Sequence, residues 1–580
     1  MQVLCGIIVP LVLLASSFAL ADAACTSPTS RTSWCDGFSI NTNYYEEAPD
    51  TGVKREYYFN LEQVIASPDG YTRTVYAING SIPGPTIVAD WGDIVQVHIT
   101  NNLSAARNGT SIHFHGIRQN YTNQMDGVTS ITECPIAPGS STTYTWKATQ
   151  YGTSWYHSHI GLQAWEGVAG AIVINGPATA SYDVDSGPIL LSDWSHTPVD
   201  ELYSSALTKG PPLMSNGLIN GTNTWNDSVV VVGERFKLSV DAGSTYRLRL
   251  INGAIDTHFK FSIDNHFITV IAMDFVPIQP YNTTVLDIAM GMLCFDPPGL
   301  RFVPTANPCT ILGQRYDVLV TADQASIAND HWIRAIPQIA CSNNGNPDDT
   351  RGVLYYGKEP DTPSTTGYSY TDACVDEPIA NLVPYVPLAA GSQNRSDSVT
   401  VTISRSNVLL WTIDSVSFNV TWSNPTLLQM MGNDSDFSKQ SHVIELNEAN
   451  TWEYLIIQSS FAVSHPIHLH GHDFYILAQG TGTYDSSQLT ASANPPRRDV
   501  ALLPPAGHLV LAFKADNPGA WLMHCHIGWH TNMGLALQFV EQYSVARDLV
   551  DYDRLNSTCE AWIKYAASEN VTQYMYDDGI

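Results

Sequence analysis

Residues 524–530 read "HCHIGWH", which places a cysteine between two histidines and adds a third histidine four positions later. The stretch lies among short segments of alternating polarity, which are typical of β-strands. On a strand, neighbouring side chains point to opposite faces and side chains two positions apart share one face. We therefore expect His524 and His526 to point one way and Cys525 the other. The motif then serves at least two sites, on opposite sides of one strand.

The two ends of the chain repeat the same motifs. "IHFHG" (112–116) recurs as "IHLHG" (467–471), and "HSHIG" (157–161) recurs as "HCHIG" (524–528). This repetition predicts a duplicated domain. Aligning the two ends puts Ser158 at the position of Cys525, Gln163 at His530, Thr110 at His465 and Val168 at Leu535. The first copy therefore lacks every residue that we expect around Cys525.

Strand patterns dominate the rest of the chain. In "DIVQVHITNN" (93–102), Val95, Val97 and Ile99 alternate with polar residues, as in a half-buried strand. "TYRLRLING" (245–253) repeats the pattern, with arginines on the second face. Helical periodicity is scarce before about residue 540. The chain is predicted to be all-β and built of sandwiches, and linkers near 175–188 and 358–367 divide it into three similar parts.

Charge and the first residues indicate a secreted protein. The 580 residues carry a net charge of −28, with 27 basic against 55 acidic residues, so the chain would repel a phosphate backbone and we expect no nucleic-acid partner. Residues 1–24 form an apolar run, broken by Pro10, that ends in small residues, as in a cleaved signal peptide. No later segment has transmembrane length, so we expect no membrane partner.

Cysteine usage agrees with an oxidising compartment. Nine cysteines remain after Cys5 leaves with the signal, and an odd count leaves one for another purpose. Cys525 is the candidate, and the other eight allow four disulfides. Sequons for N-glycosylation fit an extracellular glycoprotein; examples are Asn102, Asn108, Asn282, Asn394, Asn419 and Asn433.

The histidines divide into two sets of candidate metal ligands. Four pairs supply eight imidazoles: His113 and His115, His157 and His159, His468 and His470, His524 and His526. Imidazoles alone suit several copper ions. Cys525 with His465 and His530 forms the His₂Cys set typical of a blue copper centre. A lone histidine is more often an ordinary residue, so we expect no metal at His98, His196, His258, His266, His331, His442, His472 or His508.

The four motifs "HFHG", "HSH", "HPIHLHGH" and "HCHIGWHTNMGL" resemble those of the multicopper oxidases, and among them the ascomycete fungal laccases. The resemblance covers nearly the whole mature chain. It implies three consecutive cupredoxin-like domains, each a Greek-key β-sandwich, at 25–175, 176–360 (without copper ligands, but part of the substrate pocket) and 361–560, with a tail at 561–580. It also implies four copper ions. One type 1 copper would lie on Cys525, His465 and His530, one type 2 copper on His113 and His468, and a type 3 pair on His115, His157, His159, His470, His524 and His526.

The resemblance further implies laccase activity in a monomer. Such an enzyme oxidises phenolic and related aromatic substrates by single electrons at the type 1 copper and reduces O₂ to water at the other three. His530 would form the floor of the substrate pocket, Asp256 in "INGAIDTHF" would accept the phenolic proton, and Asp126 in "QMDG" would relay protons near the cluster.

Three further positions follow from the resemblance. Leu535 would occupy the axial position of the type 1 copper, where many blue sites have methionine. Cys134 and Cys559 match a disulfide between the first domain and the C-terminal region. The final "DDGI" is similar to tails that enter the oxygen or water channel of this group, but departs from them at Asp578 and Ile580.

Two alternatives remain open. Another multicopper oxidase, acting on ascorbate, bilirubin or a metal ion such as Fe(II), would have the same ligands and a different pocket, although Leu535 counts against an ascorbate oxidase. A non-catalytic copper electron-transfer protein needs only the type 1 ligands, and the complete set of eight cluster imidazoles argues against it.

Overall fold

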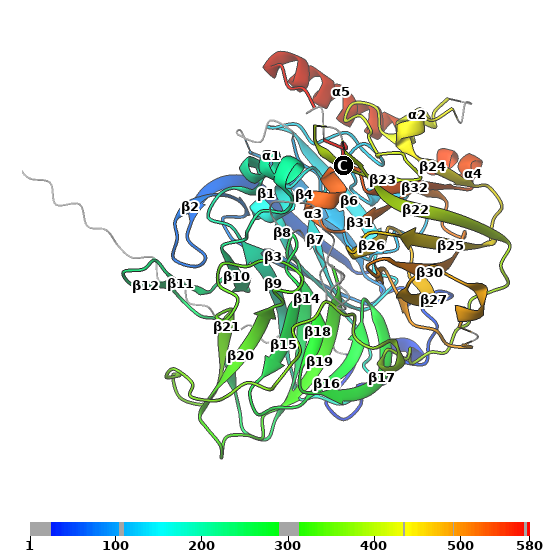
Figure 1. The fold of residues 1–580 in the computed structure, drawn as a ribbon. Helices are drawn as coiled ribbons and strands as arrows, with labels where there is room; N and C mark the ends of the chain where they lie inside the picture. Colours follow the sequence, from blue (N-terminus) through cyan, green and yellow to red (C-terminus); the bar gives the residue numbers. More distant parts are fainter. Residues whose placement is uncertain are drawn as a thin grey trace, which may run out of the picture.

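The computed structural model describes residues 25–103, 109–288, 313–405, 407–432, 436–490, 492–573 and 577–580. The expected signal peptide at 1–24 lies outside these ranges. Most of the described elements are strands, and they form three pairs of facing sheets (Figure 1), so the all-β prediction is confirmed. Among the described residues, no helix is both long and apolar enough to cross a membrane.

The first pair of sheets carries two of the histidine motifs. One sheet has the order β2 (Arg73–Ile78), β1 (Lys54–Ala66), β4 (Ile94–Asn101) and β6 (Ser141–Lys147). The other has the order β3 (Gly84–Asp90), β8 (Ala169–Asn175), β7 (Gly152–His157) and β5 (His113–Phe114). In β4, Val95, Val97 and Ile99 are fully buried and their neighbours are half-buried, as the alternation predicts.

The second pair of sheets carries none of the histidine pairs. The six-stranded sheet has the order β10 (Asn216–Ile219), β9 (Val184–Trp194), β14 (Thr245–Asn252), β19 (Arg315–Thr321), β16 (Ile268–Met273) and β17 (Val276–Thr283). The five-stranded sheet has the order β13 (Lys237–Val240), β21 (Arg351–Tyr356), β20 (Asp330–Pro337), β15 (Phe259–Ile263) and β18 (Leu286–Ile288). A separate hairpin joins β11 (Thr224–Asn226) to β12 (Val231–Gly233).

The prediction that β14 is half-buried is wrong. Its arginines are as buried as its apolar residues, because their face packs against β7 of the first sandwich. Arg249 Nη1 donates to Thr153 Oγ1 at 2.9 Å. Arg249 also pairs with Asp185 at 2.6 Å, and Arg247 pairs with Asp317 at 2.5 Å, so the charges are compensated inside the interface.

The third pair of sheets carries the other two histidine motifs. One sheet has the order β23 (Leu409–Ile413), β22 (Arg395–Arg405), β25 (Trp452–Ser459), β30 (Gly507–Lys514), β27 (Phe474–Thr481) and β28 (Arg497–Arg498). The facing sheet has the order β24 (Val443–Leu446), β32 (Ala536–Glu541), β31 (Gly519–Cys525), β26 (His465–Leu469) and β29 (Val500–Leu503).

The described helices lie between or after the sheets, and only α5, with 18 residues, is long. They are α1 (Val199–Lys209), α2 (Thr426–Gln429), α3 (Gly528–Asn532), α4 (Tyr543–Leu549) and α5 (Tyr552–Glu569), with 3₁₀ turns η1 (Cys35–Gly37), η2 (Asn123–Met125), η3 (Gln163–Glu166), η4 (Ile379–Asn381), η5 (Lys439–Ser441) and η6 (Ser486–Gln488). Helix appears mainly after residue 540, as predicted. The expected boundary of the tail at 560 falls inside α5.

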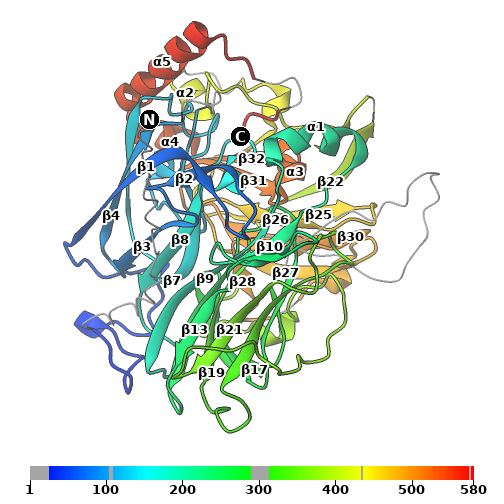
Figure 2. The same cartoon turned by 90° about the vertical axis from the view of Figure 1, so that its left-hand side faces the viewer.

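Disulfides and the C-terminus tie the ends of the chain together. Cys134 bonds Cys559 on α5, which confirms the pairing implied by the resemblance. Two local disulfides join Cys25 to Cys35 and Cys341 to Cys374, and Cys525 is free and buried; Cys294 and Cys309 lie outside the described residues. The C-terminus lies inside the molecule between α1 and α2 (Figure 2), where Ile580 is 2% exposed and its carbonyl accepts Gly161 N–H at 2.8 Å.

Candidate metal centre

Four short strands bring the histidine motifs together. In the first sandwich β5 pairs with β7, so that His113 lies opposite His157. In the third, β26 pairs with β31, so that His468 lies opposite His524. Each sheet therefore presents its histidines on two neighbouring strands, and the two sets of histidines face each other. The duplicated motifs thus supply equal halves of one cluster.

The eight paired imidazoles meet in this buried space. The ring centroids of His115 and His468 are 3.9 Å apart, and those of His113 and His470 are 4.1 Å apart, so the contacts cross between sandwiches. His470 Nε2 lies 3.2 Å from His524 Nε2, and His526 Nε2 lies 3.2 Å from His115 Nδ1. All eight rings are at most 6% exposed. The ring nitrogens of the eight histidines therefore form one compact, buried cluster.

Hydrogen bonds to oxygen atoms fix which ring nitrogen is left for a metal in six of the eight histidines. The Nδ1–H groups donate to carbonyl or carboxylate oxygens, which cannot donate in return: His113 to Asp126 O (2.8 Å), His157 to Ser158 O (3.0 Å), His468 to Asp499 O (2.8 Å), His470 to Asp126 Oδ2 (2.9 Å) and His524 to Cys525 O (2.9 Å). His115 is reversed, since its Nε2 lies 3.3 Å from Asp499 Oδ1. Such outer partners orient metal-binding imidazoles and set their tautomer.

The imidazole nitrogens that make no hydrogen bond to an oxygen are suitable copper ligands. Nε2 of His113, His157 and His468 has no hydrogen-bond partner although each atom is buried. Buried polar atoms are normally satisfied, and a bound metal would satisfy these three nitrogens. Ligand atoms lie within 4.8 Å of one another in groups of three, among them His159, His470 and His524. Burial lowers the pKa of the imidazole of His524 to about 3, which keeps it in the neutral, metal-binding form.

Cys525 lies on the other face of the strand, with a second set of ligands. Its Sγ is 3.6 Å from His530 Nδ1, and these atoms and a ring nitrogen of His465 lie within 4.8 Å of one another. Both nitrogens of His465 are without a partner, and burial lowers its pKa to about 3. Burial raises the pKa of the Cys525 thiol, so a bound metal must displace its proton. The set combines one soft thiolate with two imidazoles, which are the donors of a blue copper site.

Two neighbours complete this second set. The ring of Trp411 packs on both His465 and His530, at centroid distances of 4.5 and 4.6 Å. Leu535 is fully buried, its carbonyl accepts Cys525 N–H at 3.0 Å, and its own N–H donates to His530 O at 3.1 Å. Leu535 is therefore held by the backbone groups of two candidate ligands, and its axial role stays a prediction.

The first sandwich brings the aligned positions together in the same way, but their side chains are not metal ligands. Thr110 Oγ1 and Ser158 Oγ both donate to Gln163 Oε1, at 2.6 and 2.8 Å. Ser158 N–H donates to Val168 O at 2.9 Å, the counterpart of the bond between Cys525 and Leu535. The aligned positions thus converge in space, and hydrogen bonds between neutral side chains replace the ligands.

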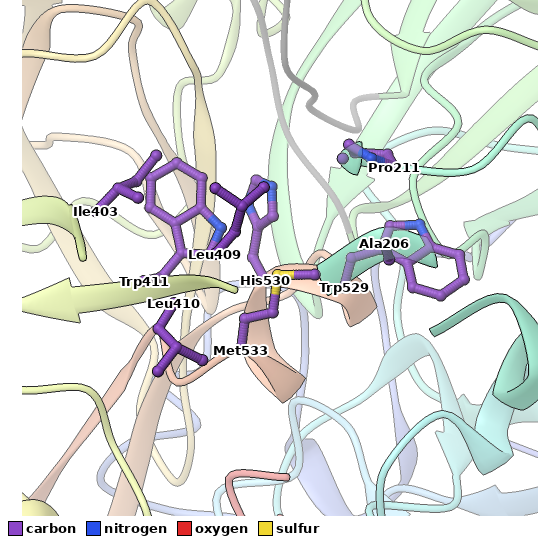
Figure 3. A pocket seen from close by; sticks show the side chains of 10 residues that line it. Ala206, Pro211, Ile403, Leu409, Leu410, Trp411, Trp529, His530 and Met533 are labelled. Carbon is purple, nitrogen blue, oxygen red and sulfur yellow. The ribbon is translucent and has the colours of Figure 1, made fainter. Parts of the chain in front are cut away.

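An apolar pocket opens beside His530. Its described lining consists of Ala206, Gly210, Pro211, Ile403, Leu409, Leu410, Trp411, Trp529, His530 and Met533 (Figure 3). His530 Nε2 has no hydrogen-bond partner. Asp256 lies behind this wall: it is 1% exposed, and Trp529 Nε1–H donates to its Oδ2 at 2.9 Å.

Two carboxylates support the cluster. Asp126, which the sequence identified, contacts His470 and also lies 3.2 Å from His113 Nδ1. Asp499, which the sequence analysis missed, contacts His115 through its side chain and His468 through its carbonyl. Arg315 pairs with Asp499 at 2.5 Å, but burial outweighs this and raises the pKa of the carboxyl to about 7. In the sequence, Asp499 stands only in the charged run "RRD" directly before β29, and that run does not identify a role.

The family is shown by comparison with known proteins. Models of the multicopper oxidase family match residues 60–179, 185–294 and 415–544. The chain belongs to the multicopper oxidase family. It is 45% identical to Laccase-2 of Botryotinia fuckeliana, with 94% of this chain and 92% of that protein covered.

Solved structures agree. The crystal structure of the laccase from Botrytis aclada matches with a TM-score of 0.88 at 43% identity, covering 96% of this chain and 100% of that one. Fet3p, a multicopper oxidase that functions in iron import, matches with a TM-score of 0.73 at 25% identity, covering 90% and 96%. The fold is therefore cupredoxin-like, the protein is an oxidase of the laccase group, and its cofactor is copper.

Proposed function

We propose that this laccase removes single electrons from phenolic and related aromatic donors at a site on one face of β31 and delivers four of them to O₂ at the other face. The observation that carries the proposal is the division of ligands across that strand. Cys525 lies beside an apolar pocket, and its covalent neighbours His524 and His526 belong to the imidazole cluster. Bound copper supplies one-electron redox chemistry at both faces.

The tautomers support a proposed assignment for four copper ions. Cys525, His465 and His530 would hold the type 1 ion, with Leu535 at the axial position. Nε2 of His113 and of His468 would hold the type 2 ion. The type 3 pair would be shared between His115, His157 and His526 on one side and His159, His470 and His524 on the other. The contacts between His115 and His526 and between His470 and His524 support this division.

On the donor side, the chain binds an aromatic ring against apolar walls and reaches it with one imidazole. His530 Nε2 would contact the donor, since it is the ring nitrogen that Cys525 leaves free. Removing the phenolic proton with the electron avoids a costly radical cation. Asp256 would take this proton at Oδ1, which has no hydrogen-bond partner, while Trp529 holds Oδ2.

On the oxygen side, Asp126 and Asp499 would hold protons for the formation of water. Each contacts two of the candidate ligands, and the pKa of Asp499 near 7 suits proton exchange around neutral pH. The His524 Nδ1–H bond to Cys525 O adds a second connection, besides the peptide bond, between the two faces.

Asp256→Asn tests the donor side. We expect kcat/KM for a phenol to fall at least tenfold, about 1.4 kcal/mol of transition-state stabilisation, because an amide cannot accept the proton. A non-phenolic one-electron donor should lose much less. Equal losses on both donors would remove the proton-accepting role from Asp256.

The function as a whole is tested by copper content, visible spectrum and O₂ uptake with a phenol, ascorbate and Fe(II) in parallel. We expect four coppers, a blue band and O₂ uptake driven by the phenol. Preference for ascorbate or Fe(II) would identify another multicopper oxidase, and a blue protein without O₂ uptake would be an electron-transfer protein. The described lining of the pocket contains no carboxylate, which disfavours Fe(II).

The domain division and cellular context are also proposals. We propose domains at 25–175, 176–360 and 361–560, since the three pairs of sheets lie within these ranges. We also propose a secreted, glycosylated monomer, in agreement with the disulfides.

A further inference from the structure

A buried aspartate anchors the wall of the pocket from behind. Asp193 lies near the end of β9 and is 5% exposed. Its Oδ1 accepts Ile255 N–H at 2.8 Å, and its Oδ2 accepts the N–H groups of Asp256 and Thr257, each at 3.1 Å. Three charge-assisted bonds to consecutive backbone groups hold the segment 255–257 in one conformation.

This segment contacts the helix that carries His530. The carbonyl of Ile255 accepts Gly528 N–H at 3.3 Å, and Asp256 Oδ2 accepts Trp529 Nε1–H at 2.9 Å. Gly528 and Trp529 are the first two residues of α3, and His530 follows them. Asp193 therefore acts on the pocket through one intervening segment and does not line the pocket itself.

The anchor also brings two carboxyl groups together in a buried place. The groups that face Asp256 are Asp193 from β9, Trp529 from α3 and Ser342 from the loop after β20, and none of these described groups is cationic. Burial and, second, the charge of Asp193 raise the pKa of Asp256. Asp193 thus affects the Asp256 carboxyl in two ways, through the hydrogen bonds that fix its segment and through its negative charge.

We propose that Asp193 is a positioning residue for phenol oxidation: it fixes the segment 255–257 so that Asp256 holds Trp529, the residue next to His530 on α3, and its negative charge favours proton uptake by Asp256. The inference rests on the proton-accepting role of Asp256 in the proposed function. It predicts a change in pH dependence that a purely structural role would not cause.

The test is Asp193→Asn in the full-length, copper-loaded enzyme. The amide keeps the shape but loses the charge and one acceptor, so we expect kcat/KM for a phenol to fall about tenfold. Asp256 must be ionised to accept a proton. Loss of the neighbouring charge lowers its pKa, so the acid limb of the phenol pH profile should move about one unit to lower pH. The type 1 reduction potential and the pH profile of a non-phenolic donor should stay unchanged.

Two further variants separate charge from packing. Asp185→Asn removes another carboxylate of β9 that is equally buried but pairs with Arg249, away from the pocket. It should lower thermal stability without moving the acid limb. Asp193→Glu keeps the charge while disturbing the spacing, so kcat/KM for a phenol should fall while the acid limb stays near that of the unchanged enzyme. If Asp193→Asn does not fold, this selective fall tests the positioning role, and an unchanged kcat/KM would overturn it.

The outcomes are distinguishable. An acid limb that stays in place in Asp193→Asn, or one that moves equally in Asp193→Glu, would overturn the inference. If Asp256→Asn loses phenol oxidation selectively but Asp193→Asn does not, only the role of Asp193 fails. If Asp256→Asn affects both donors equally, the proposed function of Asp256 fails first.

Discussion

Cys525 shows how much one side chain decides at the residue scale. Its neighbours on both sides point into the imidazole cluster, while its own sulfur points to His530 and His465. A change at this position alters one face of β31 and leaves the other face intact, because neighbouring side chains on a strand do not share a side.

Cys525→Ser should therefore remove the blue colour and abolish oxidation of donors while the three-copper cluster stays loaded. The visible spectrum and the copper content per chain measure the two effects separately. A variant that remains blue would show that Cys525 is not the thiolate ligand, and loss of all four coppers would show that the two faces do not load independently.

Leu535→Met is expected to lower the reduction potential of the type 1 site. A thioether sulfur donates weakly to copper and favours the oxidised ion, whereas leucine donates nothing; the axial group is one of the main controls on this potential. A tenfold change in the one-electron equilibrium corresponds to about 59 mV, and a fall of that order is expected. A redox titration of the blue absorbance measures it, and an unchanged or raised potential would place residue 535 off the axial position.

The sequence predicts residues that carry their own chemistry better than residues that act through others. Histidine pairs and the flanked cysteine were identifiable because copper needs those side chains at that spacing. Asp499 and Asp193 were not, because an aspartate becomes a support only through its contacts across the fold. Asp499 meets His115 from 384 positions away in the chain.

At the element scale, β7 and β31 are two versions of one strand. Each ends in a histidine motif, yet Ser158, Gln163 and Thr110 form hydrogen bonds where Cys525, His530 and His465 gather. The positions next to β7 converge as those next to β31 do, but they carry no metal-binding side chains.

Ser158→Cys should accordingly create no second blue site. Gln163 and Thr110 offer amide and hydroxyl groups, which do not complete a His₂Cys set. The spectrum of copper-loaded Ser158→Cys should match that of the unchanged enzyme in the blue band. A doubled band would show that the first sandwich still assembles a type 1 site.

Strand periodicity predicted faces but not what covers them. β4 has one buried and one half-buried face, whereas both faces of β14 are buried, although the two sequences alternate alike. The difference arises because β14 packs against β7 of another sandwich, which no local pattern encodes. Likewise, the match of Asp256 to the pocket acid did not reveal that Trp529, one of the residues that line the pocket, holds its Oδ2.

At the scale of the whole molecule, the cluster lies where sandwiches meet, and ion pairs surround it. Arg315 from the second sandwich pairs with Asp499 from the third, and Arg498 pairs with Asp274 at 2.6 Å in the opposite sense. Cys134 and Cys559 join the first sandwich to α5. The eight imidazoles are thus held in a shared interface that each sandwich only partly builds.

Copper should therefore stabilise the whole fold, and its removal should leave a protein that is sensitive to acid. A ligand that binds only the folded state raises the free energy of unfolding, so chelated protein should unfold at lower temperature than loaded protein.

In the folded apoprotein, burial lowers the pKa of His465 and His524 to about 3, from about 6.5 when unfolded. Above pH 6.5 both states bind the same number of protons. As pH falls from about 6.5 towards about 3, the unfolded state binds more protons than the folded state. Each such imidazole then lowers the free energy of unfolding by up to about 1.4 kcal/mol per pH unit. Urea unfolding of the apoprotein at pH 7 and pH 4.5 should show the lower midpoint at pH 4.5. Equal midpoints, or no gain on adding copper, would mean that these histidines are not buried as neutral ligands between the sandwiches.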